Sequence, residues 1–374
     1  MSRTIDKPLV DSPTAPALRL TEFSHGGGCG CKISPAVLRE IIARSSLPIV
    51  PPDLLVGIET SDDAAVYRIN DHQAIVATTD FFMPIVDEPF DFGAIAAANA
   101  LSDIYAMGAT PLFALALVGM PVDRLPIETI RRILDGGESV CAKAGVPIAG
   151  GHTIDSVEPI YGLVAIGLID PARIKRNRGA QAGDALILGK PLGVGIYSAA
   201  LKKQSLPAGR YQTMLATATR LNTPGIALGA MNSVHALTDV TGFGLLGHLL
   251  EICRASAVSA EIAFRSVPLL PDAVALADLG FVTGASSRNW VSYGAEVDGE
   301  FSPTERALLT DPQTSGGLLV ACSPDAVDEV LRAFRTDGFE HASVIGDVVA
   351  GPPRVAVSIA RATSVAKPMH ASAQ

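Results

Sequence analysis

The sequence has few cysteines, few charged residues and no long apolar run, and each shortage excludes a class of protein. Five cysteines in 374 residues do not form a disulfide framework, and Cys141, Cys253 and Cys322 each stand alone in apolar surroundings, so reduced thiols are expected. The longest apolar runs, such as residues 112–120, are far shorter than the roughly 20 residues that a membrane helix needs. We therefore expect no membrane partner.

Basic residues are also in short supply. Lys and Arg total 29 against 38 Asp and Glu, and the resulting net charge of -9 argues against nucleic acid as a partner. The N-terminus shows no charged start followed by an apolar segment, so no secretory signal is predicted and the cytoplasm is the expected location. What is present is 48% hydrophobic residues and 35 glycines, the composition of a folded enzyme with many tight turns.

Length and pattern predict two domains of mixed α/β (or α+β) class. A chain of 374 residues exceeds the usual size of one hydrophobic core. Strands are expected at 63–67, 74–79, 112–120, 159–169, 185–189, 236–238 and 318–322, and helices at 36–43, 92–107, 127–144, 213–221 and 245–254. We expect flexible tails at 1–19 and 361–374, an N-terminal domain at 20–175 and a C-terminal domain at 176–360.

Carboxylates in apolar or glycine-rich surroundings are the most unusual local feature. Five aspartates share it: Asp62, Asp63, Asp80, Asp103 and Asp239. A buried carboxylate is costly unless a cation or hydrogen-bond donors compensate for its burial. Several that converge would suit Mg²⁺, which takes oxygen ligands and usually binds together with phosphate. For any single aspartate, however, capping a helix or a turn is the commoner role.

Cys29 lies in a glycine-rich stretch, residues 24–32, which we expect to be a mobile loop that leads into a helix beginning at Ser34. Lys32 and the free N–H groups of that helix should both lower the pKa of the Cys29 thiol. The alternative is half of a structural zinc site made by Cys29, Cys31 and His25. The chain has no second Cys/His pair with finger-like spacing, which weighs against zinc.

Three glycine-rich segments could bind an anion through backbone N–H groups: 150–153, 238–244 and 314–317. Each could also be an ordinary turn, and His152 could be a structural histidine. Lys32 follows a glycine run, which favours a phosphate contact over a solvated lysine, although the run is not a P-loop. Spacing alone does not decide among these roles.

Seven segments together resemble the selenophosphate synthetase family in order and spacing. They are HGGGCGCK at 25–32, TSDDAAV at 60–66, TTDFFMP at 78–84, NALSDIYAMG at 99–108, AGGHTID at 149–155, LTDVTGFGLLGH at 237–248 and DPQTSGG at 311–317. The resemblance implies the two-domain α/β fold of the aminoimidazole ribonucleotide synthetase superfamily, with an N-terminal sheet completed across a homodimer.

The resemblance also implies an activity. Members of that family convert ATP, selenide and water to selenophosphate, AMP and phosphate with Mg²⁺, and the product supplies selenium for selenocysteine or selenouridine. ATP and selenide are thus the implied small-molecule partners, and a selenium-delivery protein is a further one. By this similarity Cys29 and Lys32 are the catalytic residues, and the Mg²⁺ ligands are Asp63, Asp103 and Asp239.

The nucleotide contacts that the resemblance implies form a longer set. They are Lys32, Thr60, Ser61, Asp62, Asp80, Asp103, Gly151, His152 and Thr153, of which the last three would reach the partner subunit's nucleotide. Two other functions fit part of the pattern. An amide-forming or amidine-forming synthetase of the same superfamily would not need the loop from Cys29 to Lys32, and a zinc or selenium carrier would leave the aspartates unexplained.

Overall fold

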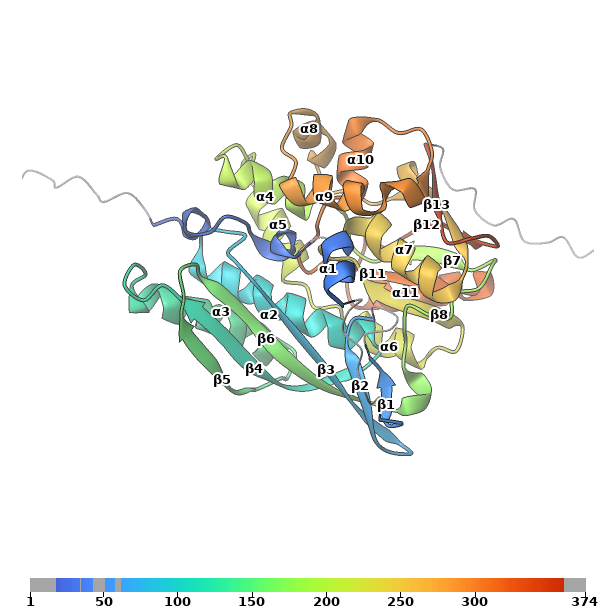
Figure 1. Ribbon diagram of the computed structural model, residues 1–374, viewed down its shortest axis with the longest axis horizontal. Helices are drawn as coiled ribbons and strands as arrows, with labels where there is room; N and C mark the ends of the chain where they lie inside the picture. The colour runs from blue at the N-terminus through green and yellow to red at the C-terminus, as the bar shows by residue number, and fades with distance from the viewer. Residues whose placement is uncertain (1–17, 34, 43–50, 58–61, 360–374) are drawn as a thin grey trace, which may run out of the picture.

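The computed structural model describes residues 18–33, 35–42, 51–57 and 62–359. The helix cap expected at Ser34, the nucleotide contacts expected at Thr60 and Ser61, and nearly all of both expected tails lie outside these residues. The described chain has two halves, each built on one β-sheet with helices packed against it (Figure 1). No described helix is long and apolar enough to cross a membrane.

The first half contains a six-stranded sheet. Its elements are η1 (Leu20–Phe23), η2 (Gly28–Cys31), α1 (Pro35–Ile42), β1 (Leu54–Val56), β2 (Ala65–Asn70), β3 (Gln73–Phe82), α2 (Pro89–Ala106), β4 (Thr110–Met120), α3 (Ile127–Lys143), β5 (Ile148–Asp155) and β6 (Ile160–Ile169). The strand order is β1-β2-β3-β6-β4-β5, and only β4 and β5 pair in parallel. Helices α2 and α3 cover one face of this sheet (Figure 1).

Helix α2 lies at the centre of the molecule because it is apolar on almost every side. All of its residues from 92 to 106 are buried. It packs against β3, β6 and α3 of its own half and also contacts α5, α6 and β8 of the second half. Gly93 permits the close approach of α3, since a Cβ there would lie 1.8 Å from an α3 carbonyl oxygen. The helix therefore carries Asn99 and Asp103 to the junction of the two halves.

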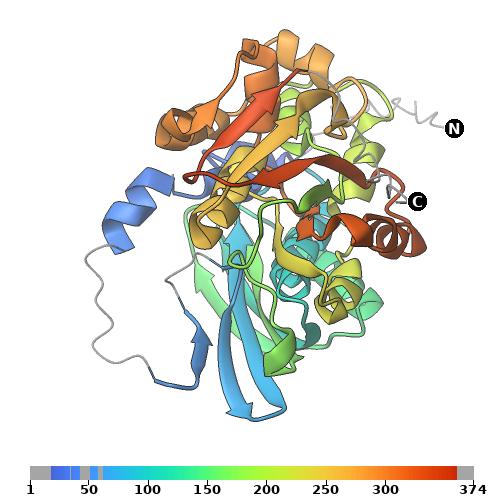
Figure 2. The ribbon, with the colours of Figure 1, turned by 90° about the vertical axis from the view of Figure 1, so that its right-hand side faces the viewer.

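The second half contains a seven-stranded sheet in the order β10-β13-β9-β12-β7-β11-β8. Its elements are η3 (Pro171–Arg173), β7 (Ala185–Leu188), α4 (Val194–Lys202), α5 (Arg210–Ala218), α6 (Pro224–Ala230), β8 (Val234–Asp239), α7 (Gly244–Ser256), β9 (Ser259–Ala263), η4 (Phe264–Ser266), α8 (Ala273–Asp278), α9 (Gly284–Tyr293), η5 (Gly294–Glu296), β10 (Val297–Asp298), α10 (Pro303–Leu309), β11 (Leu318–Cys322), η6 (Pro324–Ala326), α11 (Val327–Thr336), β12 (Ser343–Val349) and β13 (Val355–Ser358). Figure 2 shows this half above the first sheet. The edge strand β8 contacts α2, so its C-terminal end lies at the junction.

The expected strands and helices are present, with ends that differ by a few residues. The turn considered for residues 150–153 was wrong, because these residues lie inside β5. There β5 pairs with β4, and Gly151 lies opposite Ala116 and His152 opposite Leu117. The free edge of β4 supplies backbone hydrogen bonds, and this pairing outweighs the weak strand preference of glycine.

The face of the first sheet that points away from α2 and α3 is apolar and open in the described chain. Tyr67, Ile75, Phe81 and Leu112, from β2, β3 and β4, are between 36% and 48% exposed. Exposed and buried residues alternate along most of β3, as expected for a sheet with one covered face. An exposed apolar face of this kind is typical of a protein interface.

Candidate active site

Three aspartates that are far apart in the sequence meet where the two halves join. Asp63 precedes β2, Asp103 lies on α2 and Asp239 is the last residue of β8. One carboxylate oxygen from each lies within 4.8 Å of the other two. In the part of the chain that the structure describes, this is the one group of three or more Asp, Glu, His or Cys side chains close enough to share a metal ion. The fold therefore brings together the three residues predicted as Mg²⁺ ligands.

This aspartate cluster is short of positive charge. Burial and the charge of Asp239 raise the pKa of Asp63 and that of Asp103 well above their usual values. Burial also raises the pKa of Asp239, although a hydrogen bond from Ser102 opposes the rise. Ionised carboxylates that share a site repel each other, and a divalent cation between them removes the repulsion. A donor set of carboxylate oxygens alone fits a hard cation such as Mg²⁺.

A hydroxyl group holds each carboxylate of the cluster in place. The hydrogen bonds run from Thr78 Oγ1 to Asp103 Oδ2, from Thr238 Oγ1 to Asp63 Oδ1 and from Ser102 Oγ to Asp239 Oδ2, at 2.5–2.8 Å. Asn222 Nδ2 donates to Ser102 Oγ at 2.7 Å and to the carbonyl oxygen of Gly316 at 2.9 Å. Sequence reasoning missed these supporting residues. Ser102 stands next to a predicted ligand, but nothing near Asn222 in the sequence indicates its role.

Lys32 and Asp80 form an ion pair beside the cluster. Lys32 Nζ donates to Asp80 Oδ2 at 2.9 Å, and Asn99 Nδ2 donates to the same oxygen at 2.8 Å. The lysine side chain is 35% exposed, so solvent or a ligand can reach it. Burial alone would lower the pKa of Lys32, but Asp80 and the other nearby acidic groups raise it well above its usual value. Lys32 is therefore held firmly as a cation.

The Cys29 thiol is buried, and this corrects the expectation of a thiolate favoured by its neighbours. Its residue is 1% exposed, Sγ lies 3.2 Å from Asn99 Oδ1, and its backbone N–H donates to Thr314 Oγ1 at 3.1 Å. Burial raises the pKa of Cys29 well above its usual value, and the opposing effect of Lys32 is smaller. The predicted lowering of this pKa is wrong for this conformation, because the desolvation cost of a thiolate exceeds the attraction of one lysine.

The glycine-rich segment passes close to the second half. Gly28 has a φ of +54°, a left-handed conformation that glycine adopts at little cost. A Cβ at this position would lie 2.3 Å from Thr314 Oγ1, the atom that accepts from the N–H of Cys29. Glycine is thus required here for both backbone conformation and packing. The mobility of the segment remains a prediction.

Residues 311–317 hold α4 and Asn99 in place through hydrogen bonds. Gln313 Oε1 accepts from the N–H groups of residues 193 and 194 at the start of α4, and Asp311 Oδ2 accepts from the N–H of residue 195. The N–H of Ser315 donates to Asn99 Oδ1 at 2.7 Å. The segment therefore fixes α4 and Asn99, and anion binding by its other N–H groups stays a prediction.

Asp62 adjoins the cluster, whereas three other predicted nucleotide contacts lie away from it. Asp62 Oδ1 accepts from the N–H of Asn177, in the connection between the halves, at 2.7 Å. Gly151, His152 and Thr153 are exposed on β5, and β6 and β4 separate β5 from the strand that carries Asp80. Within one chain these three residues are therefore not part of the site.

His25 does not join the two cysteines in a zinc half-site. Its side chain is 76% exposed, and its ring Nδ1 lies 2.9 Å from Glu158 Oε2. No cysteine belongs to a metal-ligand group among the described residues. The arrangement thus disfavours the zinc alternative.

Comparison with known proteins gives the family. Residues 61–169 match the family model described as AIR synthase related protein, N-terminal domain, and residues 181–358 match the corresponding C-terminal domain. A selenide, water dikinase from Burkholderia ambifaria is 65% identical over 349 residues, which cover 92% of this chain and 98% of that protein. This chain belongs to the selenide, water dikinase family. A selenide, water dikinase from Dechloromonas aromatica is 64% identical and is covered to 98%, against 91% of this chain.

The fold is shared beyond the selenide, water dikinase family. A thiamine-monophosphate kinase from Stenotrophomonas maltophilia superposes with a TM-score of 0.60 at 22% identity, over 87% of this chain and 97% of that one. HypE from E. coli superposes with a TM-score of 0.60 at 20% identity, over 80% of this chain and 91% of that one. The fold class and the family expected from the sequence are confirmed.

Proposed function

We propose that this chain is a selenophosphate synthetase: it transfers the γ-phosphoryl group of ATP to selenide and releases AMP and orthophosphate. The family carries the reaction type, because the curated relatives are dikinases of selenide and water. The location of the active site is supported by one observation: the aspartate cluster, Lys32 and Cys29 lie together at the junction of the two halves. A site of this composition suits phosphoryl transfer, which depends on charge neutralisation and alignment.

The metal that we assign to the cluster is Mg²⁺, held by Asp63, Asp103 and Asp239. Their spacing and their raised pKa values support this assignment, since a cation would relieve the repulsion among them. When bound, Mg²⁺ supplies the positive charge that neutralises the triphosphate. The hydroxyls of Thr78, Thr238 and Ser102 orient the carboxylates toward one another.

Lys32 is the side chain that we assign to the nucleotide phosphates. It is positively charged and partly open to solvent, and its charge reaches Asp103 and Asp239 of the cluster. Asp80, held by Asn99, keeps the ammonium in place. In the proposed reaction, selenium forms a bond to the γ-phosphorus while the bond from that phosphorus to the β-phosphate oxygen breaks. Water then attacks the β-phosphorus of the ADP, which gives AMP and phosphate.

Cys29 is the group that we assign to the selenium substrate. Its S–H donates to Asn99 Oδ1, and Lys32 is near enough for its charge to act on the thiol. A selenide that replaces this contact would sit beside the cation that approaches the phosphates. The resemblance of the glycine-rich segment to that of the family supports the same assignment.

A homodimer would complete the nucleotide site. The open apolar face of the first sheet supplies a surface for a second copy, and the exposed strand β5 could then bring Gly151, His152 and Thr153 to the partner's nucleotide. Thr60, Ser61 and Asp62 remain proposed nucleotide contacts by resemblance. By the same resemblance we propose a cytoplasmic location, a selenium-delivery protein as partner, and use of the product for selenocysteine or selenouridine.

The product pattern tests the proposal. With ATP, Mg²⁺ and selenide under anaerobic conditions, phosphorus NMR should show AMP, orthophosphate and a species with a phosphorus–selenium bond. The absence of selenide should stop the reaction. Stoichiometric ADP as the final nucleotide, or turnover that is indifferent to selenide, would instead indicate an amide-forming synthetase of the same fold.

A further inference from the structure

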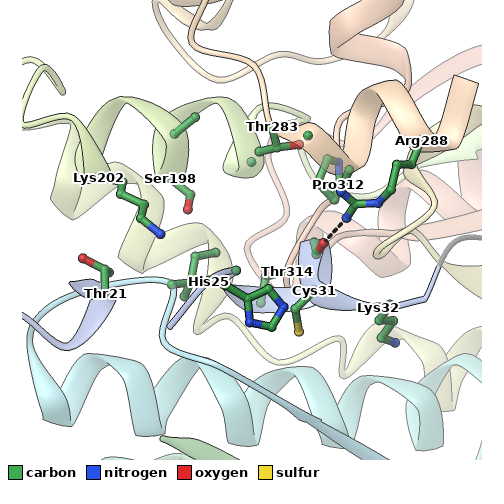
Figure 3. A pocket seen from close by; sticks show the side chains of 18 of the residues that line it. Thr21, His25, Cys31, Lys32, Ser198, Lys202, Thr283, Arg288, Pro312 and Thr314 are labelled. Carbon is green, nitrogen blue, oxygen red and sulfur yellow. Dashed lines mark hydrogen bonds between the residues drawn. The ribbon is translucent and has the colours of Figure 1, made fainter. Parts of the chain in front are cut away.

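A basic pocket lies between the glycine-rich segment and the second half. It has a volume of about 600 Å³, and Figure 3 shows it between η2 on one side and α4 and the start of α9 on the other. Lys32, Lys202 and Arg288 line it. None of the described residues that line it is Asp or Glu, although Asp80 pairs with Lys32 and Glu158 with His25 from outside the lining. Such a lining favours an anionic ligand.

Lys202 and Arg288 reach the pocket from opposite sides and bind the glycine-rich segment. Lys202 Nζ lies 3.3 Å from the carbonyl oxygen of Ser24, and Arg288 Nη2 donates to the carbonyl oxygen of Gly30 at 3.0 Å, the dashed line in Figure 3. A carbonyl oxygen satisfies a donor but carries no net charge, so neither hydrogen bond neutralises the cation that makes it. Glu158 does not line the pocket; it pairs with His25, and its charge also interacts with that of Lys202.

The pocket lies beside the stretch of chain that carries Cys29. Gly27, Gly30 and Cys31 line it, while Cys29 itself is buried. Thr314 also lines the pocket, and its Oγ1 accepts from the N–H of Cys29. None of the clustered aspartates lines the pocket. An anion in the pocket is therefore held near Cys29 by residues other than the clustered carboxylates, which would repel it.

We propose that this pocket collects the anionic selenium substrate, hydroselenide or another small selenolate, and supplies it to Cys29 from a side that none of the metal-binding aspartates lines. The inference rests on the proposed function. Hydroselenide is a monoanion near neutral pH, whereas the cluster and the triphosphate are strongly negative. A cleft with cations on its walls raises the local concentration of such an anion by about 10-fold or more.

The charge of the pocket can be measured without any catalysis. Cys31 lines the pocket and is partly exposed, so its alkylation by anionic iodoacetate can be compared with that by neutral iodoacetamide. Tandem mass spectrometry locates the label, and the same ratio in urea-unfolded protein gives the reference. Both reagents react with the thiolate, so the ratio of the two alkylation rates does not depend on the fraction of Cys31 that is ionised. We expect the folded protein to favour iodoacetate by about 10-fold at low salt, and added salt should reduce this preference.

Variants then assign the effect to two side chains. The double variant Lys202→Gln/Arg288→Gln should lower the alkylation ratio about three- to tenfold. Lys203→Gln is the matched control, because Lys203 follows Lys202 but lies over the ring of Phe281 and does not line the pocket. Because Cys31 also borders a second pocket with Asp80 and Glu158, the comparison among variants decides: a ratio that is equal in the wild type, the double variant and the control would overturn the proposal.

Steady-state kinetics shows whether selenide or orthophosphate binds in the pocket. In the double variant the KM for selenide should rise about three- to tenfold, while kcat and the KM for ATP change less than about twofold. The charge-preserving pair Lys202→Arg/Arg288→Lys should restore the KM, which separates charge from packing. If inhibition by orthophosphate weakens while the KM for selenide is unchanged, the pocket serves the phosphate product and the proposal is wrong. A wild-type protein without selenide-dependent turnover would refute the proposed function, and the alkylation ratio would still report on the pocket.

Discussion

Replacing Asp103 by asparagine should change stability in opposite directions with and without Mg²⁺. Asp103 is 9% exposed, and one of its carboxylate oxygens lies within 4.8 Å of oxygens of Asp63 and Asp239. Asparagine has the same shape and can still accept the hydrogen bond from Thr78. The substitution therefore removes a charge and a metal ligand and leaves the packing largely intact.

The distances among the three carboxylates set the expected change in the free energy of unfolding. Two unit charges 4.8 Å apart repel each other by about 3.5 kcal/mol at an effective dielectric constant of about 20. Carboxyl groups with raised pKa values avoid part of this repulsion by keeping a proton, so we expect Asp103→Asn to gain about 1–3 kcal/mol in EDTA at pH 8. With Mg²⁺ at 100 times its Kd the wild type gains about 2.7 kcal/mol, and the variant gains much less.

The pH dependence follows from the same shift. The folded-state pKa of Asp103 is raised above its ordinary value of 3.8, so the folded protein holds this proton more tightly than the unfolded chain. The stability that this group contributes is therefore fully present below about pH 3.8 and is lost as the pH rises through the raised pKa. Without Mg²⁺, wild-type stability should fall with pH in this window more steeply than that of Asp103→Asn.

Chemical denaturation between pH 4 and 9, with EDTA or Mg²⁺, measures the change in stability caused by Asp103→Asn, the stabilisation by Mg²⁺ and the pH dependence of stability. Asp123→Asn serves as the control, because Asp123 is exposed and outside the cluster. If Asp103→Asn were clearly less stable than the wild type in EDTA at pH 8, the carboxylates would not repel each other as argued. Equal stabilisation of both proteins by Mg²⁺ would show that Asp103 is not a ligand.

Three further outcomes are expected. Cys29→Ser should abolish selenide-dependent turnover with an unchanged Tm, while Cys31→Ser should keep most of it; equal and complete loss in both would contradict the assignment of Cys29. Asn222→Ala should leave Ser102 and the Gly316 carbonyl without a donor, so titration should show Mg²⁺ affinity lowered about 10-fold, and unchanged affinity would rule out this supporting role. Phe81→Glu places a charge on the open sheet face and should give monomers by light scattering where the wild type is dimeric; an unchanged dimer would place the interface elsewhere.

Several parts of the site were predictable because they depend on short stretches of chain. An aspartate at the end of a strand, as Asp239 is, or four residues from Asn99 on one helix face, as Asp103 is, takes a position set by local geometry. The expected strands and helices were found for the same reason, since their apolar patterns span only a few turns or residues. The segment at 150–153 was misjudged because its conformation depends on pairing with β4, where Gly151 lies opposite Ala116 and His152 opposite Leu117.

The sequence by itself determined the α/β class through local periodicity and the family through the order of its motifs, and the resemblance to that family indicated which three of five aspartates converge. Only the tertiary structure decided the state of the Cys29 thiol, because desolvation depends on Asn99 and Thr314, which arrive from distant segments. It also decided that Asn222 supports Asp239 through Ser102, and that Lys202 and Arg288 face one pocket. Burial and long-range contacts are properties of the packed chain, and no local pattern records them.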